Sequence, residues 1–244
     1  MFFKVEHSTI AFGGLIANSD INVDVEKGQI VGLIGPNGAG KSTLFKSISG
    51  FNKIDSGKIY FNGHDLTRRS PNHICNMGIA CTFQNAQSFG GMTLEESVLV
   101  GAYLRRRHKK AALAYAHEMI DFVGLSGKEN VFIPRLNMFE RKKTELASAL
   151  ATEPKMLLLD ELFAGLVPTE ISLMVDIVKK VNTEKKIVLF IVEHVLRVIM
   201  ELCEKIYVME YGKMIASGTP QQVSSDENVI KAYLGADYDV TQNK

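Results

Sequence analysis

The chain has 244 residues, with 28 lysines and arginines against 27 aspartates and glutamates. Hydrophobic residues make up 46% and charged residues 23%, which is typical of a globular protein with one large domain or one domain carrying an insertion. This charge balance gives no field that argues for nucleic acid as a partner, and three cysteines without metal or redox spacing fit a reducing cytoplasm.

Short strands are predicted near the start of the chain. Apolar and alternating patterns indicate strands at residues 2–10, 21–25 and 29–34, a helix at 41–49, and further strands at 58–61 and 79–83. The N-terminus lacks a signal-peptide core, and the apolar run at 187–192 is far shorter than the ~20 residues of a membrane span. Any role at a membrane would therefore come through a partner.

One match to the pattern G-x-x-x-x-G-K-[ST] lies between the strand at 29–34 and the helix at 41–49. Glycines let backbone N–H groups turn inward around phosphate oxygens, and the following helix points its positive dipole end at them. Lys41 can reach the β- and γ-phosphates, and Ser42 offers a hydroxyl to Mg²⁺. The expected nucleotide-binding residues of this phosphate loop, residues 35–43, are Gly35, Pro36, Asn37, Gly38, Ala39, Gly40, Lys41, Ser42 and Thr43. The loop alone leaves kinases, GTPases and transport ATPases open.

Helical spacing follows over residues 93–150, and buried-strand composition returns at 156–160 and 187–192. Residues 168–181 and 195–203 are predicted to be crossover helices. Strands that alternate with helices indicate an α/β fold with a mostly parallel sheet, here interrupted by an inserted α-helical subdomain.

Two carboxylates close the predicted strand at 156–160. A buried strand would deliver Asp160 to its C-terminal edge, where α/β proteins bind ligands. We expect Asp160 to hold Mg²⁺ through water and Glu161 to polarise an attacking water as general base. A strand followed by an ordinary acidic turn is the alternative.

Two further side chains follow predicted strands. His194 comes just after the strand at 187–192, where it could donate a hydrogen bond to a γ-phosphate and the attacking water. Gln84 follows the strand at 79–83, where a neutral amide could contact Mg²⁺ and water. A histidine on a helix N-terminus and a solvated glutamine are the ordinary alternatives.

The order of these motifs resembles the ATP-binding-cassette (ABC) ATPases. The set comprises the phosphate loop, Thr82-Phe83-Gln84-Asn85, the strand ending in Asp160-Glu161, Ala164-Gly165-Leu166 and Glu193-His194. The resemblance runs from Phe2 to about Asp237. Phe12-Gly13-Gly14-Leu15 and the tail at 229–235 look most like the branched-chain amino acid importer ATPases. The lipopolysaccharide-export and urea-import ATPases share parts of this pattern.

The resemblance implies a fold and a role for each matching residue. It implies a P-loop ATPase core with an N-terminal antiparallel β portion, divided into a RecA-like core with its β subdomain at 1–90 and 151–244 and a helical subdomain at 91–150, within a single domain of 1–244. Phe12 would stack on adenine, Gln84 would be the Q-loop glutamine and His194 the switch histidine. Asp160 and Glu161 would be the metal-binding and catalytic carboxylates, and residues 164–167 the D-loop at the seam of a head-to-tail ATP-binding dimer.

The chain departs from the family at the signature motif, which should read close to Leu-Ser-Gly-Gly-Gln. Residues 136–140 read Leu136-Asn137-Met138-Phe139-Glu140, so only the leucine matches. Asn137 could cap the following helix as serine would, but Phe139 would crowd the backbone approach to a phosphate and Glu140 would add negative charge there. Because this motif acts on the other subunit's ATP, we expect a heterodimer with a second ABC ATPase rather than a homodimer. Leu162 in place of a proline and Val167 in place of a polar D-loop residue are smaller departures.

The expected function is an ATPase that uses ATP and Mg²⁺ to energise an importer of branched-chain or related amino acids. Its implied partners are transmembrane permease subunits and, indirectly, a solute-binding protein, which would place it at the cytoplasmic face of the cell membrane. Lipopolysaccharide-type or urea-type transport and a weakly hydrolysing regulatory subunit are alternatives. A non-transport ATPase of this fold ranks lower, because the chain has one phosphate loop and no heptad insertion. The basic run at 105–110 is expected to be a solvated helix end, with lipid headgroup contact as the alternative.

Overall fold

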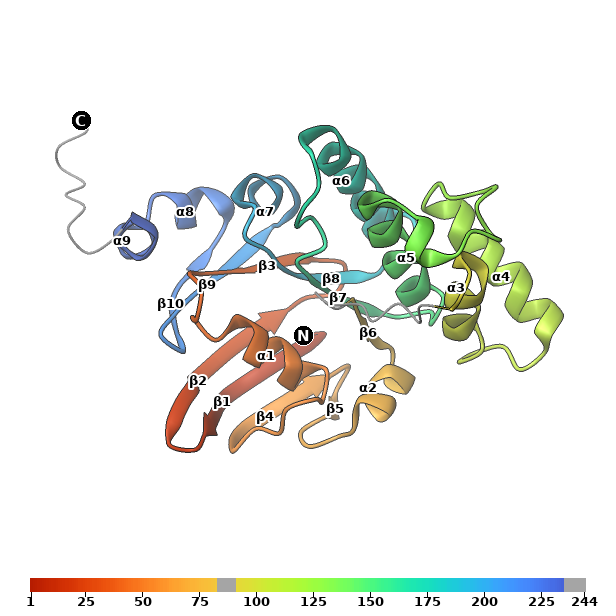
Figure 1. Ribbon diagram of the computed structural model, residues 1–244. Helices are drawn as coiled ribbons and strands as arrows, with labels where there is room; N and C mark the ends of the chain where they lie inside the picture. The colour runs from red at the N-terminus through yellow and green to blue at the C-terminus, as the bar shows by residue number, and fades with distance from the viewer. Residues whose placement is uncertain (83–90, 235–244) are drawn as a thin grey trace. The chain divides into compact units, whose positions relative to one another are not determined.

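A computed structural model describes residues 1–82 and 91–234 (Figure 1). The chain forms two compact units, of which the first contains Met1–Pro71 and Val188–Lys244 and the second contains Asn72–Ile187. The division into a core at 1–90 and 151–244 and a helical subdomain at 91–150 stays a prediction.

An antiparallel sheet occupies the N-terminal part of the first unit. Its strands are β1 (Phe3–Phe12), β2 (Leu15–Val25), β4 (Ser56–Phe61) and β5 (His64–Asp65), in the order β2-β1-β4-β5. Buried and exposed side chains alternate along much of β1 and β2, as expected for a sheet with one face on a core. The strands predicted at 2–10, 21–25 and 58–61 are therefore confirmed, each extended by a few residues.

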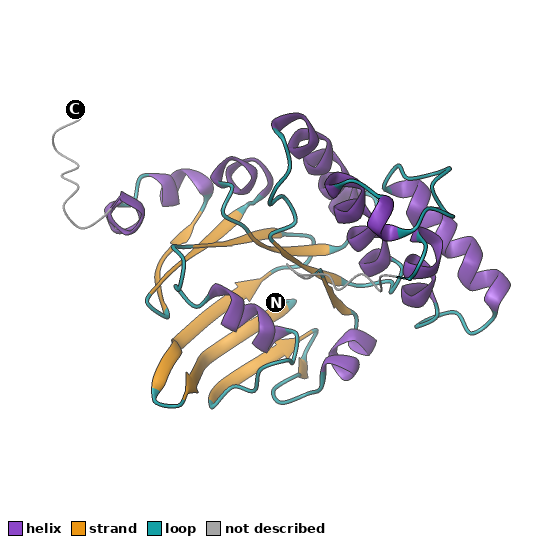
Figure 2. Ribbon diagram, in the orientation of Figure 1, coloured by secondary structure: helices purple, strands orange, loops and turns teal. Residues whose placement is uncertain are grey.

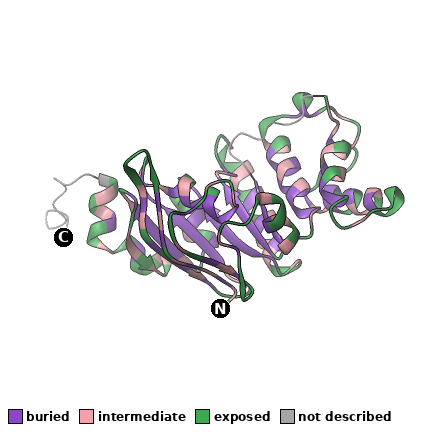
Figure 3. Ribbon diagram, turned by 90° about the horizontal axis from the view of Figure 1, so that it is seen from below, coloured by how far each residue is buried: buried purple, intermediate pink, exposed green. Residues whose placement is uncertain are grey.

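Mostly parallel strands form the other sheet of the first unit. These strands are β3 (Ile30–Ile34), β8 (Val188–Val192), β9 (Lys205–Glu210) and β10 (Lys213–Gly218), in the order β10-β9-β3-β8. The strand β3 pairs in parallel with β8 and β9, while β9 and β10 are antiparallel. Every residue of β3 and β8 is buried, which explains their continuous apolar sequences. Buried residues are purple in Figure 3.

Four helices accompany these strands in the first unit. They are α1 (Lys41–Ile48), α7 (Leu196–Leu202), α8 (Pro220–Ser224) and α9 (Glu227–Leu234). Helix α1 packs against both β2 and β8 (Figure 1). The sequence analysis did not identify β9 and β10.

The second unit is predominantly helical (Figure 2). Its elements are α2 (Pro71–Met77, which starts at the boundary), β6 (Ile79–Cys81), α3 (Leu94–Ala102), α4 (Lys109–Phe122), the short 3-10 helix Ile133–Arg135, α5 (Met138–Leu150), β7 (Met156–Asp160) and α6 (Pro168–Thr183). Helices α3, α4 and α5 pack against one another, and β6 pairs in parallel with β7. Together the two units confirm the predicted α/β fold with an N-terminal antiparallel sheet, mostly parallel strands and helical segments.

The basic run at 105–110 is only partly solvated. The Arg105 guanidinium donates to the backbone carbonyls of Asn76 at 2.9 Å and of Cys75 and Thr152 at 3.3 Å. Arg106 forms an ion pair with Glu153 and lies over the Tyr115 ring, 3.6 Å from its centroid. Arg105 is exposed, as expected of a solvated helix end, although its guanidinium also binds these carbonyls, whereas Arg106 is half-buried and departs from the expectation. Within the described residues, no helix is long and apolar enough to cross a bilayer.

Candidate functional site

The phosphate loop connects the buried strand β3 to helix α1 in the first unit. Gly35 has φ +150°, and a Cβ there would lie 2.1 Å from the Met209 carbonyl oxygen. Gly40 has φ +99°, and a Cβ there would lie 2.5 Å from the Ala17 carbonyl oxygen. Only glycine fits at either end of the loop, because a side chain would clash with backbone and disfavour the required dihedral.

Helix α1 begins without a side-chain cap, since its N-cap residue is Gly40. Helix N-termini attract anions through unsatisfied N–H groups and the positive end of the dipole. Lys41 is 5% exposed, and its Nζ donates to the Gly35 carbonyl at 2.7 Å and to the Pro36 carbonyl at 3.0 Å. Ser42 is exposed in the first turn. The ammonium is therefore held at the mouth of the loop, and the hydroxyl beside it is accessible.

Hydrogen bonds from two residues distant in sequence, Asn18 on β2 and Gly212, hold the phosphate loop. The amide Nδ2 of the buried Asn18 donates to the Gly40 carbonyl at 3.1 Å, and the Gly212 N–H donates to the Ala39 carbonyl at 3.0 Å. Neither residue was identified from the sequence, because only the fold brings residues 18 and 212 to the loop. Phe12 ends β1 and is 52% exposed. Its hairpin partner Leu15 lies three residues before Asn18, about 10 Å along the strand.

His194 follows strand β8, which pairs with the strand that leads into the phosphate loop. Strands β3 and β8 are parallel, with Leu33 opposite Val192. If this register continued by two residues, His194 would lie opposite Gly35, at the same edge of the sheet. The imidazole is exposed, and the backbone N–H of His194 donates to the buried Glu193 carboxylate at 3.3 Å. In the first unit, Lys41 and Ser42 thus follow β3 and His194 follows the neighbouring parallel strand β8.

The second unit holds the predicted carboxylates at the end of β7. Asp160 is 7% exposed, and its N–H donates to the Thr82 hydroxyl at 3.2 Å. The Thr82 N–H in turn donates to the Leu158 carbonyl at 2.9 Å. Thr82 is therefore an anchor that the sequence analysis missed, and it fixes the end of β6 beside Asp160. Gln84 follows two residues later and lies outside the described residues.

Glu161 has an unusual backbone conformation. Its φ is +51°, in the left-handed region that non-glycine residues rarely adopt. Its carbonyl accepts hydrogen bonds from the Lys142 ammonium at 3.2 Å and from the Ala164 N–H at 3.3 Å. Such strain persists where surrounding contacts hold it, and it concentrates at functional sites.

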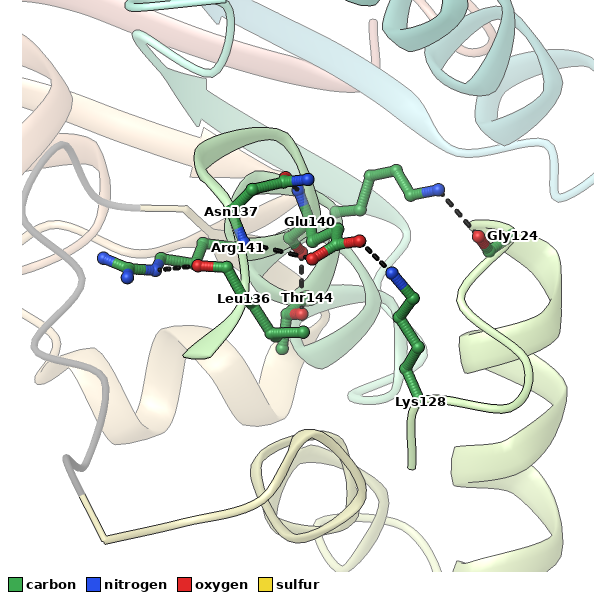
Figure 4. A network of polar contacts seen from close by, with 8 residues as sticks. Gly124, Lys128, Leu136, Asn137, Glu140, Arg141 and Thr144 are labelled. Carbon is green, nitrogen blue, oxygen red and sulfur yellow. Dashed lines mark hydrogen bonds and ion pairs between the residues drawn. The ribbon is translucent and has the colours of Figure 1, made fainter. Parts of the chain in front are cut away.

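The 136–140 segment contains the start of helix α5, which has a capping box (Figure 4). The Asn137 side chain accepts from the Glu140 N–H at 2.9 Å, and the Glu140 carboxylate accepts from the Asn137 N–H at 3.0 Å. Asn137 thus caps α5, as expected. The same carboxylate forms an ion pair with Lys128, which holds the pKa of Glu140 below its usual value. Glu140 is therefore ionised, and its negative charge is paired with Lys128 within the chain.

The two other substituted positions of this segment carry large side chains. Met138 is 52% exposed and lies near Gly165 of the D-loop, about 4 Å from where a Cβ on that glycine would sit. Phe139 is half-buried, and the Lys143 ammonium lies over its ring, 5.0 Å from the ring centroid. The segment therefore contains no glycine that would let a phosphate approach its backbone N–H groups closely.

Asn52-Lys53-Ile54-Asp55 matches the Asn-Lys-x-Asp pattern of guanine-reading GTPases. These residues follow α1 directly, and the Asp55 carboxylate accepts from the Ala11 N–H at 2.7 Å. The Asp55 N–H donates to the Thr9 carbonyl at 2.9 Å. Asp55 thus binds the backbone near the C-terminal end of β1, which gives this residue a structural role.

Comparisons with known proteins agree with this arrangement. A family model described as ABC transporter matches residues 18–164, and one described as branched-chain amino acid ATP-binding cassette transporter matches residues 213–239. The chain is 33% identical to the high-affinity branched-chain amino acid transport ATP-binding protein BraF of Pseudomonas aeruginosa, over 95% of this chain and 97% of BraF. It is 36% identical to the lipopolysaccharide export system ATP-binding protein LptB of Haemophilus influenzae, over 90% of this chain and 91% of LptB. The crystal structure of the ADP conformation of MJ1267, an ATP-binding cassette of an ABC transporter, superposes with a TM-score of 0.87 at 31% identity, over 96% of this chain and 98% of that chain.

Proposed function

Because this chain belongs to the ABC transporter family, whose ATP-binding cassettes couple ATP hydrolysis to transport, we propose that it energises an importer of branched-chain or related amino acids. The observation that carries the substrate class is the branched-chain cassette model at residues 213–239, joined to the near full-length match with BraF. The 36% identity to LptB makes lipopolysaccharide export the second candidate. A urea-type transporter and a regulatory cassette with weak hydrolysis are less favoured, because the matched proteins named above are branched-chain amino acid and lipopolysaccharide systems.

The phosphate loop fits a nucleotide through its backbone and its lysine. Residues 35–43 would hold the phosphates, with Lys41 moving from the Gly35 and Pro36 carbonyls to the β- and γ-oxygens. The exposed Phe12 ring would cover the adenine, since its hairpin leads into the strand that supports Gly40. These assignments rest on an uncapped helix N-terminus and on glycines that no other residue could replace.

The hydrolytic roles would fall to residues that end or follow the strands and to Ser42 in the first turn of α1. Ser42, Asp160 and Gln84 would hold Mg²⁺, the first two from exposed and buried positions respectively. Mg²⁺ would supply charge neutralisation between the β- and γ-phosphate oxygens. Glu161 would orient and deprotonate the attacking water, and His194 would donate a hydrogen bond near the γ-phosphate.

We further propose that the chain works as a heterodimer with a second cassette. In head-to-tail pairing, the 136–140 segment would face the partner's ATP, where backbone N–H groups must approach the γ-phosphate closely. Here Phe139 and Met138 replace the small residues, and the Asn137 and Glu140 N–H groups are engaged in the capping box. A partner with an intact signature motif would complete the site built on Lys41 and Glu161, while the partner's own site would turn over slowly.

Placement at the cytoplasmic face of a membrane would follow from docking on permease subunits, with a solute-binding protein acting indirectly. The test is to purify the complex through a tag on this chain, identify its subunits and reconstitute it in vesicles with its binding protein. Stimulation of ATP hydrolysis by leucine, isoleucine or valine, lost in Glu161→Gln, would support the proposal. Stimulation by lipopolysaccharide or urea instead would overturn the amino-acid assignment.

A further inference from the structure

Lys142 is a buried lysine that contacts the predicted general base. It lies on α5 and is 6% exposed, although lysines are rarely buried unless they are paired. Its Nζ donates to the Glu161 carbonyl at 3.2 Å. The nearest carboxylate, that of Glu145 on the same helix, lies 3.9 Å from Nζ, beyond hydrogen-bond distance. Within the part of the chain that the structure describes, the Lys142 ammonium thus donates its hydrogen bond to the Glu161 backbone.

The Glu161 backbone needs such support. Its φ of +51° is disfavoured for a residue with a side chain, and the same carbonyl also accepts from the Ala164 N–H. Relaxation of φ to a negative value would rotate the Cα–Cβ bond and redirect the carboxylate. An ammonium on the carbonyl resists that relaxation, because turning the peptide would leave a buried charge without its hydrogen bond.

Resting on the function proposed above, we propose that Lys142 is a positioning residue that aims the Glu161 carboxylate and ties it to α5. The first turn of α5 carries the segment presented to the second cassette, and Lys142 lies one turn further along the same helix. A displacement of α5 on dimer closure would thus be transmitted through one side chain to Glu161. The chain's own hydrolysis would then depend on the helix that faces the other nucleotide.

The adjacent Lys143 provides a matched control. It is 9% exposed, and its Nζ donates to a backbone carbonyl at 2.7 Å, but that carbonyl belongs to Gly124 at the end of α4. Each of these two buried lysines of α5 thus donates a hydrogen bond to one backbone carbonyl, that of Glu161 or that of Gly124. Only Lys142 reaches Glu161, so a purely structural role predicts similar effects for the two residues.

The experiment uses the assembled transporter with the second cassette's catalytic glutamate replaced by glutamine, so that only the Lys41 and Glu161 site turns over. Lys142→Met, Lys142→Arg and Lys143→Met are compared for kcat, for KM of ATP and for Tm. The double variant Lys142→Met/Glu145→Gln removes the charged neighbour as well, in case the single variant does not fold. Glu161→Gln is measured alone and combined with Lys142→Met.

We expect Lys142→Met to lower kcat about 10- to 100-fold, as for a catalytic group displaced by about 1 Å, with KM nearly unchanged. Lys142→Arg should recover most of the loss, and Lys142→Met should add nothing to Glu161→Gln. Lys143→Met should lower Tm without a comparable loss of kcat. Equal kcat losses in the two methionine variants, or a further loss in the Glu161→Gln background, would overturn the positioning role. An unaffected kcat in Glu161→Gln itself would instead overturn the proposed function of Glu161.

Discussion

Helices α1 and α5 differ in how their N-termini are capped, although the resemblance to ABC ATPases implies that both N-termini face a bound ATP. Helix α1 starts at Gly40, whose backbone is left-handed and which provides no side-chain cap. Helix α5 starts at Asn137 with a complete capping box, and the Glu140 carboxylate is also paired with Lys128. The first N-terminus has no side-chain cap and is suited to an external anion, whereas the second is capped within the chain.

The difference separates stability from ligand binding. A capping residue typically stabilises a helix by about 1 kcal/mol, and it does so by engaging the N–H groups that an anion would otherwise use. Helix α1 lacks the stabilisation of a side-chain cap, and its first N–H groups are therefore available to a phosphate. Helix α5 has a capping box instead. We therefore propose that α1 binds ATP, and that α5 contributes only weakly to the ATP site of the partner cassette.

The largest effect should come from removing the cation of the phosphate loop. Lys41→Ala should weaken ATP binding about 100-fold or more, because charge-assisted hydrogen bonds to two phosphates are lost. Lys46→Ala, which removes an exposed lysine from the same helix, is the control. Titration with a fluorescent ATP analogue measures both. Equal affinities for the two variants would refute phosphate binding at α1.

Hydrolysis at the same site can be separated from binding. Glu161→Gln should retain ATP affinity but slow turnover of the assembled complex by about 10²–10⁴-fold, the usual contribution of a positioned general base. Glu184→Gln, at an exposed position after α6, should leave the rate unchanged. A normal rate in Glu161→Gln would mean that this chain's site does not hydrolyse ATP.

A pH effect should distinguish the interior of α5. Burial raises the pKa of Glu145 to about 7 from 4.5, and the nearby Lys142 opposes this rise. The folded state then holds a proton that the unfolded state releases, so this group lowers stability as pH rises from 4.5 to about 7. The free energy of unfolding of Glu145→Gln, relative to that of the wild type, should therefore rise between about pH 5 and about pH 8, by at most about 3 kcal/mol, and its Tm should rise with it. A constant Tm difference across that range would contradict the raised pKa.

The smallest effect concerns the cap itself. Asn137→Ala should destabilise the chain by about 1 kcal/mol, because the Glu140 N–H loses its acceptor. Thr93→Ala removes the equivalent cap of α3, which carries the same capping box, and serves as the reference. Chemical denaturation of both variants provides the measurement. A loss in Thr93→Ala alone would mean that the α5 cap does not form in solution.

Local pattern predicted the parts of this molecule that depend on neighbouring residues. The strand at 156–160 matches β7 (Met156–Asp160), and Asn137 caps α5, because an apolar run and a capping side chain act within a few residues. The phosphate loop was likewise identified from a single contiguous motif.

Contacts between distant residues could not be predicted in this way. The Glu140 carboxylate pairs with Lys128, twelve residues earlier, and Lys142 reaches the Glu161 carbonyl from nineteen residues away. Asn18 lies under Gly40 only because β2 passes beneath the loop. No spacing rule links these positions, since their proximity arises from how the elements pack.

In the proposed heterodimer, the 136–140 segment makes the two ATP sites unequal. The most direct measurement is ATP hydrolysis by the purified chain alone, before and after Asn137→Ser, Met138→Gly, Phe139→Gly and Glu140→Gln are introduced together. We expect the unmodified chain to be a poor ATPase and the restored chain to gain about 10²–10³-fold, the usual worth of a preorganised donor at a developing charge. The gain should vanish when Glu161→Gln is added. Brisk hydrolysis by the unmodified chain, unchanged by the restoration, would contradict the account.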